Sequence, residues 1–312
     1  MPAKFFTISP SLQTQLEAIL ESTWSAFPAL AQNQIAVTWI EYEPPYRVNT
    51  GGGLSSEEFW KYQPQGASYR GVELVEPASI VNLFYMVAMH SWLEQGMAAA
   101  DPEIDRALKN AIAHSSSDAA NYLIDVLTGT TSGPSLPDGP FETWLSQRNI
   151  VNRYFQRLAW PELRSINVNQ KLWQESPYGR ERDFLNKAGS NRLTTEATAR
   201  LMHSIVGGVA VSAVRSQAMM RSMLRPAQFL ATASQPSTAQ CFSQSTTTGT
   251  VRHYAAYTED ERMEGKDIHP YLLVIFTENT PENSAAMEGI VPFITQQVWQ
   301  AAVQNFRQAP PA

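Results

Sequence analysis

The chain has 312 residues, of which 43% are hydrophobic and only 17% charged, and its net charge is −6. This composition is typical of a globular protein with a sizeable core and excludes a disordered chain. The acidic balance excludes a generic surface for nucleic acid or anionic membranes, because such a surface needs excess positive charge. A single cysteine, Cys241, excludes an intrachain disulfide. Of the 23 cationic residues only six are lysine.

The apolar stretch at the start of the chain is too short for the core of a signal peptide, and no uncharged apolar run reaches the length of a membrane span. We therefore expect a cytoplasmic protein without a membrane or nucleic-acid partner. The five histidines show no metal-ligand spacing, and neither a phosphate-binding loop nor a dinucleotide fingerprint is present. We expect no metal and no cofactor.

The periodicity of apolar residues predicts the secondary structure in chain order. Helices are expected at 10–27, 79–95, 102–112, 118–127, 141–158, 194–206 and 211–224, and a last one after Pro281. Strands are expected at 34–43, 46–48, 241–258 and 271–277, with a long irregular loop at 161–193, a polar connector at 231–240 and a charged turn between the last two strands. Helices segregated from a mainly antiparallel sheet predict an α+β protein.

The sheet is thus expected to combine both ends of the chain, flanked by the N- and C-terminal helices, with a helical domain inserted between them. The predicted division is a sheet domain formed by residues 1–76 and 225–312, and a helical domain at 77–224.

Three short segments share one pattern of hydroxyl residues. Residues 76–83 read EPASIVNL and open a predicted helix, residues 114–121 read HSSSDAAN before the next short helix, and residues 245–252 read STTTGTVR in a predicted strand. In order and in element type, they resemble the Ser-x-x-Lys, Ser-Asp-Asn and Lys-Thr-Gly motifs of serine β-lactamases and penicillin-binding enzymes. The resemblance extends over nearly the whole chain and implies the β-lactamase-like fold.

The resemblance implies a role for each matching residue in the first two segments. Ser79 corresponds to the nucleophile and Asn82 to the lysine that activates it. Alignment on Ala-Ala-Asn makes Ser115 the second, proton-relaying serine, whereas a literal alignment starts the motif at Ser117. An amide cannot accept a proton near neutral pH, so Asn82 cannot serve as the general base. The related enzymes carry a glutamate on the long loop, and Glu181 lies one position out of register with it.

In the third segment, Thr247 replaces the lysine that holds the substrate carboxylate, and Thr248, Gly249 and Thr250 complete the motif. By resemblance, the backbone amides of Ser79 and Thr250 would form an oxyanion hole. Arg252 is a candidate to bind the carboxylate instead of the missing lysine, since arginine suits bidentate contacts.

Each of these residues also has a simpler interpretation. Ser79 can be a helix N-cap, the serines at 115–117 can be a capping run, and Arg252 can be an ordinary cation at a strand edge. Two functions remain open: a serine hydrolase for an amide, ester or β-lactam, with weak or no β-lactam hydrolysis, or an inactive relative that binds a ligand or acts as a scaffold. A small-molecule or peptide-like ligand fits both, and the sequence does not indicate the oligomeric state.

Overall fold

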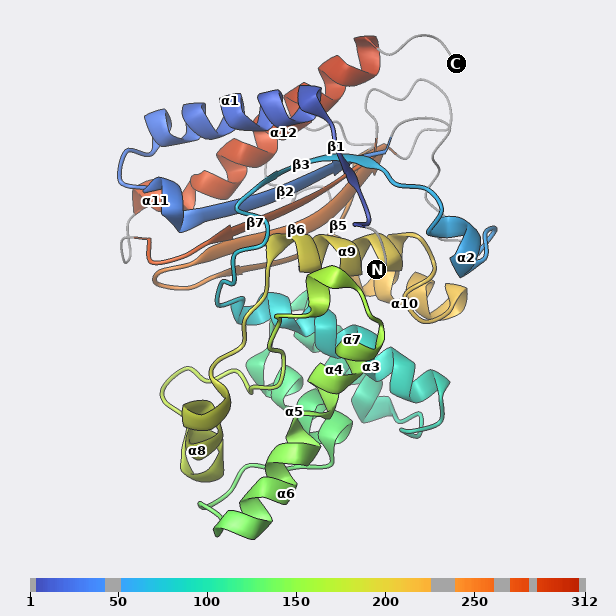
Figure 1. Cartoon of the computed structure of the whole chain (residues 1–312), viewed down its shortest axis with the longest axis vertical. Coiled ribbons are helices and arrows are strands. Elements are labelled where there is room, and N and C mark those ends of the chain that lie inside the picture. The colour runs from blue at the N-terminus through green and yellow to red at the C-terminus, as the bar shows by residue number, and fades with distance from the viewer. Residues whose placement is uncertain (1–3, 43–51, 226–238, 261–269, 281–284, 309–312) are drawn as a thin grey trace. The chain divides into compact units, whose positions relative to one another are not determined.

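A computed structural model describes residues 4–42, 52–225, 239–260, 270–280 and 285–308. The chain divides into two compact units, a helical unit at Leu74–Thr194 and a sheet unit formed by Ala3–Glu73 and Thr195–Ala312. Figure 1 shows the elements of both units in chain order.

The sheet unit is built on a seven-stranded sheet with the order β1-β3-β2-β7-β6-β5-β4. The strands are β1 Thr7–Ile8, β2 Ile35–Glu41, β3 Gln65–Tyr69, β4 Leu224–Arg225, β5 Ala239–Thr247, β6 Arg252–Asp260 and β7 Tyr271–Thr277. All neighbouring pairs are antiparallel except β1 with β3. The N-terminal β2 pairs directly with the C-terminal β7, so the sheet does combine both ends of the chain.

Both faces of this sheet are covered by helices of the same unit, as Figure 1 shows. The helices and 3₁₀ turns are α1 Pro10–Ala26, η1 Gln32–Gln34, α2 Ser56–Phe59, α9 Thr195–Val206, α10 Ala213–Met223, α11 Ala285–Glu288 and α12 Ile290–Gln308. On one face, Leu16 of α1 and Ile294 of α12 share a core with Trp39 and Leu273 of the central strands. On the other face lies α9, whose Thr195 Oγ1 is 2.7 Å from Thr38 Oγ1 of β2. Burial on both faces explains why β2 and β7 are almost continuously apolar.

The helical unit is arranged around α3, which is buried along most of its length. Its elements are η2 Ala78–Val81, α3 Asn82–Glu94, α4 Pro102–Ala113, α5 Ser117–Thr128, α6 Asp138–Arg148, α7 Ile150–Arg157, η3 Pro161–Leu163 and α8 Gly179–Ala188. Local signals set several of the ends. Asp101 caps α4 by accepting a hydrogen bond from Glu103 N at 2.7 Å, and Gly129 ends α5 with a φ of +64°.

The α+β class and the β-lactamase-like arrangement are confirmed, and several details differ from the sequence-based expectation. The stretch expected as one strand at 241–258 is a hairpin, β5 and β6, that turns at Thr248–Val251. Strand β3 was not predicted, and the expected strand at 46–48 lies outside the described residues, as do the charged turn at 261–269 and most of the connector at 231–240. The expected helix 141–158 is interrupted at Asn149, and the long loop contains α8.

The helical unit ends at Thr194, whereas the sequence-based division extended the helical domain to residue 224. The difference arises because α9 and α10 have their apolar sides against the sheet: α9 contacts β7, β2 and β6, and α10 contacts β5. Their helical periodicity alone does not indicate which core they join.

Candidate functional site

Ser79 lies in the 3₁₀ turn η2, immediately before the central helix α3. The residue before it, Ala78, has a φ of +45°, a conformation that residues other than glycine rarely adopt. Backbone strain of this kind costs about 1–3 kcal/mol and is concentrated at functional sites, where the surrounding structure enforces it. Ser79 itself is half-buried and is not the N-cap of α3; that position is held by Val81, which forms no side-chain cap.

Asn82, at the position of the expected lysine, is fully buried as the first residue of α3. Its Nδ2 donates a hydrogen bond to Ala111 O of α4 at 2.9 Å. The side chain thus links two helices of the unit. Together with the lack of basicity of an amide, this contact gives Asn82 a structural role and leaves the nucleophile position without the lysine base.

The three serines before α5 differ in their roles. Ser116 is the N-cap, because its Oγ accepts a hydrogen bond from Ala119 N at 3.3 Å, and Ser117 is the first residue of the helix. Ser115 has a φ of +50°. The capping interpretation therefore applies to the middle serine, and the strained backbone occurs at Ser115, the residue that alignment on Ala-Ala-Asn selects.

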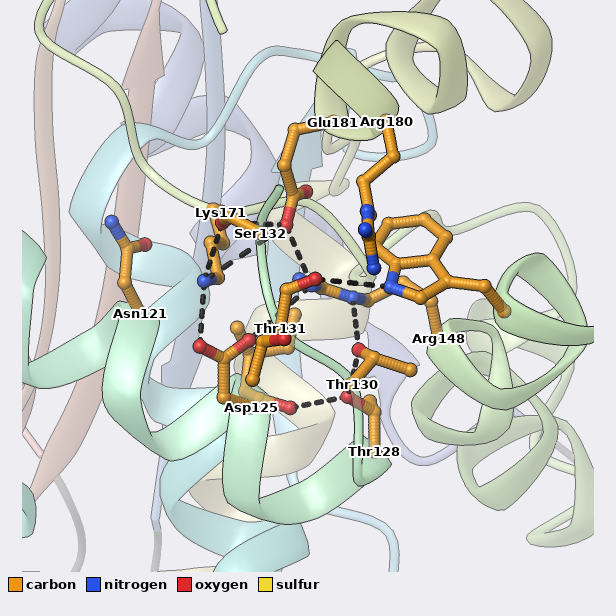
Figure 2. Close-up of polar contacts among 12 residues, drawn as sticks. Asn121, Asp125, Thr128, Thr130, Thr131, Ser132, Arg148, Lys171, Arg180 and Glu181 are labelled. Carbon is orange, nitrogen blue, oxygen red and sulfur yellow. Dashed lines mark hydrogen bonds and ion pairs between the residues drawn. The ribbon is translucent and has the colours of Figure 1, made fainter. Parts of the chain in front are cut away.

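Glu181 of α8 is fully buried, and Figure 2 shows the polar network that surrounds it. Its Oε1 accepts hydrogen bonds from Arg148 Nη2 at 2.7 Å and Ser132 Oγ at 2.9 Å. Lys171 Nζ lies 3.9 Å from the same oxygen. Glu181 is thus engaged by two cations and a hydroxyl group of the helical unit, which explains its burial and argues against its use as a solvent-accessible general base.

Asp125 completes this network, because it contacts both cations. Lys171 Nζ is 2.6 Å from Asp125 Oδ2, and Arg148 Nη2 is 3.3 Å from Asp125 Oδ1. Lys171 Nζ also donates to Ser132 Oγ at 2.8 Å. The charges of the two cations, Arg148 and Lys171, are thus balanced by those of Glu181 and Asp125. Burial lowers the pKa of Arg148, whereas Glu181 and Asp125 act in the opposite direction.

The sequence alone does not point to Asp125, Ser132, Arg148 or Lys171. They are separated by up to 46 positions along the chain, and no short motif joins them. The one available signal was that Lys171 is one of only six lysines and lies in the long loop. The loop is also fixed by Asn121, whose side chain forms two hydrogen bonds with the backbone of Leu172, at 2.9 and 2.7 Å.

The third segment forms the turn between β5 and β6 in the sheet unit. Thr247 ends β5 and pairs with Arg252, which begins β6. Between them, Thr248 N donates to Val251 O at 3.0 Å, and Gly249 and Thr250 occupy the turn. Thr250 O accepts hydrogen bonds from the backbone N and the Oγ1 of Thr280, at 3.0 and 2.8 Å. The five candidate residues of this segment therefore lie together at the turn and at the adjoining ends of β5 and β6.

Arg252 is 4% exposed, which is unusual for a cation at the start of a strand. Its guanidinium donates from Nη1 to Thr280 Oγ1 at 3.4 Å, and its Nε has no hydrogen-bond partner. Among the described residues, no carboxylate forms an ion pair with it. Among the described residues, Arg252 is thus a buried cation without an ion pair, and burial of an unpaired charge is costly.

In the part of the chain that the structure describes, no group of three or more His, Cys, Asp or Glu side chains is placed to hold a metal ion. Within the same residues, no helix is both long and apolar enough to cross a bilayer.

Comparison with known proteins places these observations in a family. A family model described as the β-lactamase enzyme family matches residues 93–302. No curated protein matches. The fold is similar to that of a β-lactamase from Sphaerobacter thermophilus, at 16% identity and a TM-score of 0.61 over 95% of this chain and 99% of that chain. It is also similar to a variant of PBP-A in its acyl-enzyme complex with penicillin G, at 16% identity and a TM-score of 0.60 over 96% of this chain and 98% of that one.

A third similar structure is a β-lactamase from Chitinophaga pinensis, at 14% identity and a TM-score of 0.59 over 93% of this chain and 99% of that chain. At these identities the solved structures establish the fold alone. The family model covers about two thirds of the sequence, and on that ground this chain belongs to the β-lactamase enzyme family.

Proposed function

We propose that this protein is a serine hydrolase homologue in which Ser79 keeps the acyl-accepting position, while β-lactam hydrolysis is weak or absent. The observation that carries this proposal is the backbone at the two serines. Ala78, next to Ser79, and Ser115 both have positive φ values although neither is glycine. Among the described residues, five non-glycine residues have positive φ values, and these two fall on segments that resemble motifs of the family. Their position favours a retained functional geometry over two unrelated capping serines.

The replacement of the motif lysine by Asn82 is the reason for weak or absent β-lactam hydrolysis. A general base contributes about 10²–10⁴-fold to catalysis, and Asn82 cannot replace it. Since Asn82 is bound to Ala111 O and Glu181 to Arg148, neither is available to take the proton of the Ser79 hydroxyl. Acylation without such a base is slow, and an acyl-enzyme once formed also lacks a group to activate water.

Arg252 binds the ligand carboxylate in place of the motif lysine, whose position is occupied by Thr247. Its buried guanidinium, without a carboxylate partner in the described residues, suits the carboxylate of a small-molecule or peptide-like ligand. The matching residues Thr248, Gly249 and Thr250 form the adjacent turn. We therefore propose an amide, ester or β-lactam ligand that carries a carboxylate.

The test is incubation of the pure protein with a fluorescent penicillin, followed by denaturing gel and mass measurement. The proposal expects a slowly formed adduct that is absent from Ser79→Ala and still present in the matched control Ser116→Ala, since Ser116 only caps α5. Absence of an adduct, together with no turnover of simple activated esters, would refute the proposal.

A second candidate is a binding or scaffold protein without any chemistry at Ser79. The structural role of Asn82, buried and tied to α4, favours it specifically. For this candidate, calorimetry with a carboxylate-bearing ligand would show binding that depends on Arg252, and neither adduct nor ester turnover would be detected.

A further inference from the structure

The side chains of Lys171 and Asp125 are held against each other within the helical unit. Lys171 Nζ lies 2.6 Å from Asp125 Oδ2, and the lysine side chain is only 7% exposed. The carboxyl carbon of Asp125 is one covalent bond beyond that oxygen, so the two groups are close to the separation of about 3–3.5 Å from which a new bond forms. An amine and a carboxyl group in this position are the reactants of an amide bond.

The backbone on both sides of Lys171 is fixed, which holds its amine at the carboxyl group. On one side, Gln170 O accepts a hydrogen bond from Tyr85 OH of α3 at 2.6 Å. On the other side, Asn121 bonds to both the C=O and the N–H of Leu172, at 2.9 and 2.7 Å. Asn121 belongs to α5, the helix that also carries the carboxyl group. Reactants fixed in this way have effective molarities of about 10⁵–10⁸ M, which favours a reaction that is negligible between free groups in water.

A hydroxyl group connects the amine to a second carboxylate. Lys171 Nζ donates to Ser132 Oγ at 2.8 Å, and Ser132 Oγ donates to Glu181 Oε1 at 2.9 Å. The same oxygen of Glu181 lies 3.9 Å from Nζ, and the Glu181 side chain is fully buried. Figure 2 shows these contacts. They form a route by which a proton can leave the amine and return, as a general acid–base group requires.

Arg148 is placed to stabilise the charge that develops on the carboxyl group. Its Nη2 lies 3.3 Å from Asp125 Oδ1, the carboxyl oxygen other than the one at Lys171. Attack by the amine on the carboxyl carbon places negative charge on Oδ1, and a fixed cation there lowers the energy of the tetrahedral intermediate. The reaction removes one buried cation and one anion together. The remaining pair, Arg148 and Glu181, is still balanced, with Nη2 and Oε1 2.7 Å apart.

We propose that Lys171 and Asp125 join in an isopeptide bond that forms within the folded helical unit. The ammonium group gives one proton to Glu181 through Ser132, and the neutral amine attacks Cγ of Asp125 to form the Nζ–Cγ bond. A second proton from the nitrogen and the proton held by Glu181 pass to Oδ2, the Cγ–Oδ2 bond breaks, and water leaves. One ammonium and one carboxylate thus become one amide and one water, and no external reagent is consumed.

The bond would close the long loop covalently onto α5, across 46 positions of the chain. It does not depend on any chemistry at Ser79. The inference therefore stands or falls separately from the proposed function.

The test is the intact mass of the purified full chain, followed by peptide mapping with trypsin. The expected mass is lower than that of the sequence by one water molecule, and trypsin should not cleave after Lys171 but release a branched peptide that joins residues 125 and 171. Lys171→Arg keeps the cation without an amine that can attack, so it should show the full sequence mass. Lys187→Arg, in the exposed ion pair with Glu142, is the matched control and should keep the loss of one water.

A further variant tests the proton route. In Glu181→Gln, samples taken after a short induction should accumulate the linked form at least tenfold more slowly than the wild type, since a general acid–base group contributes about 10²–10⁴-fold. Because this variant can fail to fold, the wild type decides: a mass equal to that of the sequence, with cleavage after Lys171, overturns the inference. A loss of one water that persists in Lys171→Arg would place the dehydration elsewhere and also overturn it.

Discussion

At the scale of single residues, the burial of Arg252 gives a test of its proposed role in ligand binding. It is buried in the sheet unit, and its guanidinium donates a hydrogen bond to Thr280 Oγ1 at 3.4 Å. Burial of a charge without an ionic partner costs several kcal/mol, and apolar residues of similar volume often restore that loss. If the role of Arg252 is to bind a ligand carboxylate, its replacement by an apolar residue should raise the free energy of unfolding and weaken ligand binding.

We predict that Arg252→Met raises the free energy of unfolding by about 1 kcal/mol and abolishes binding of a carboxylate-bearing ligand. Urea unfolding and calorimetry with benzylpenicillin measure the two effects. Arg221→Met, a change at an exposed arginine of α10, serves as the control and should alter neither by more than about 0.5 kcal/mol. A loss of stability in Arg252→Met would show that Arg252 serves the structure of the unit.

His203 of α9 determines how the sheet unit responds to acid. It is buried, its Nδ1 is 2.9 Å from Tyr42 OH, and its ring stacks on that of Tyr42. Burial, assisted by the charge of Arg200, lowers the pKa of His203 from 6.5 to about 3. Above pH 6.5 the imidazole is neutral in both states. Between pH 6.5 and 3 only the unfolded chain takes up the proton, so the folded state loses stability as the pH falls.

We predict that His203 lowers the free energy of unfolding by about 1.4 kcal/mol for each pH unit below 6.5, until about pH 3. His203→Gln, which can still hydrogen-bond Tyr42, should lose that part of the pH dependence, whereas His114→Gln at an exposed position should keep it. Unfolding in urea at pH 7.5 and 4.5 gives the slopes. Equal slopes for wild type and His203→Gln would contradict the assignment.

At the scale of elements, the helix α8 is the part of the long loop with the clearest structural explanation. Its first turn carries Glu181 into the buried network of Figure 2. The C-terminal end of α8 is exposed, and there Lys187 forms an ion pair with Glu142 of α6. Removing one member of a buried ion pair costs about 3–5 kcal/mol, whereas an exposed pair contributes at most about 1 kcal/mol.

We therefore predict that Glu181→Gln destabilises the helical unit by about 3 kcal/mol, and that Glu142→Gln, which breaks the exposed pair, costs less than about 1 kcal/mol. The double variant Arg148→Met with Glu181→Leu should lose less than the sum of its single changes, because no buried charge is then left without a partner. Thermal and urea unfolding test this. Similar losses in Glu181→Gln and Glu142→Gln would show that the buried network does not anchor α8.

The sequence predicted elements wherever a local signal ended a periodic pattern. Ser9 and Pro10 begin α1, and Asp101 caps α4, as the patterns indicate. The prediction of β5 and β6 as one strand was wrong, because the turn residues between them are threonines and one glycine within a continuous β-forming stretch. Helix α8 was missed because its sequence is polar and its stability depends on contacts of Glu181 that are distant in sequence.

For the whole molecule, the arrangement of elements could be predicted although the motif residues have changed. Identity to the similar structures is 16% or less, yet the fold is shared over more than 90% of the chain. Apolar periodicity and the order of the three segments were sufficient for that. The site chemistry could not be predicted to the same extent, since the buried network around Glu181 depends on contacts that only the folded chain brings together.

A further prediction concerns both units at once. The double variant Asn82→Lys with Thr247→Lys restores the two cations of the family motifs, and we expect it to acylate with penicillin at least tenfold faster than the wild type, since a general base contributes about 10²–10⁴-fold. Because Asn82 is buried, circular dichroism must first confirm that the variant is folded. A folded double variant no faster than the wild type would show that more than the two lysines has been lost.

The central claim, that Ser79 still accepts an acyl group, is tested most directly by the intact mass of the protein over hours with excess penicillin. We predict a gradual and persistent gain of one penicillin mass by the wild type, located at Ser79, and no gain by Ser79→Ala. An unchanged wild-type mass without ester turnover, or an equal gain in Ser79→Ala, would contradict it.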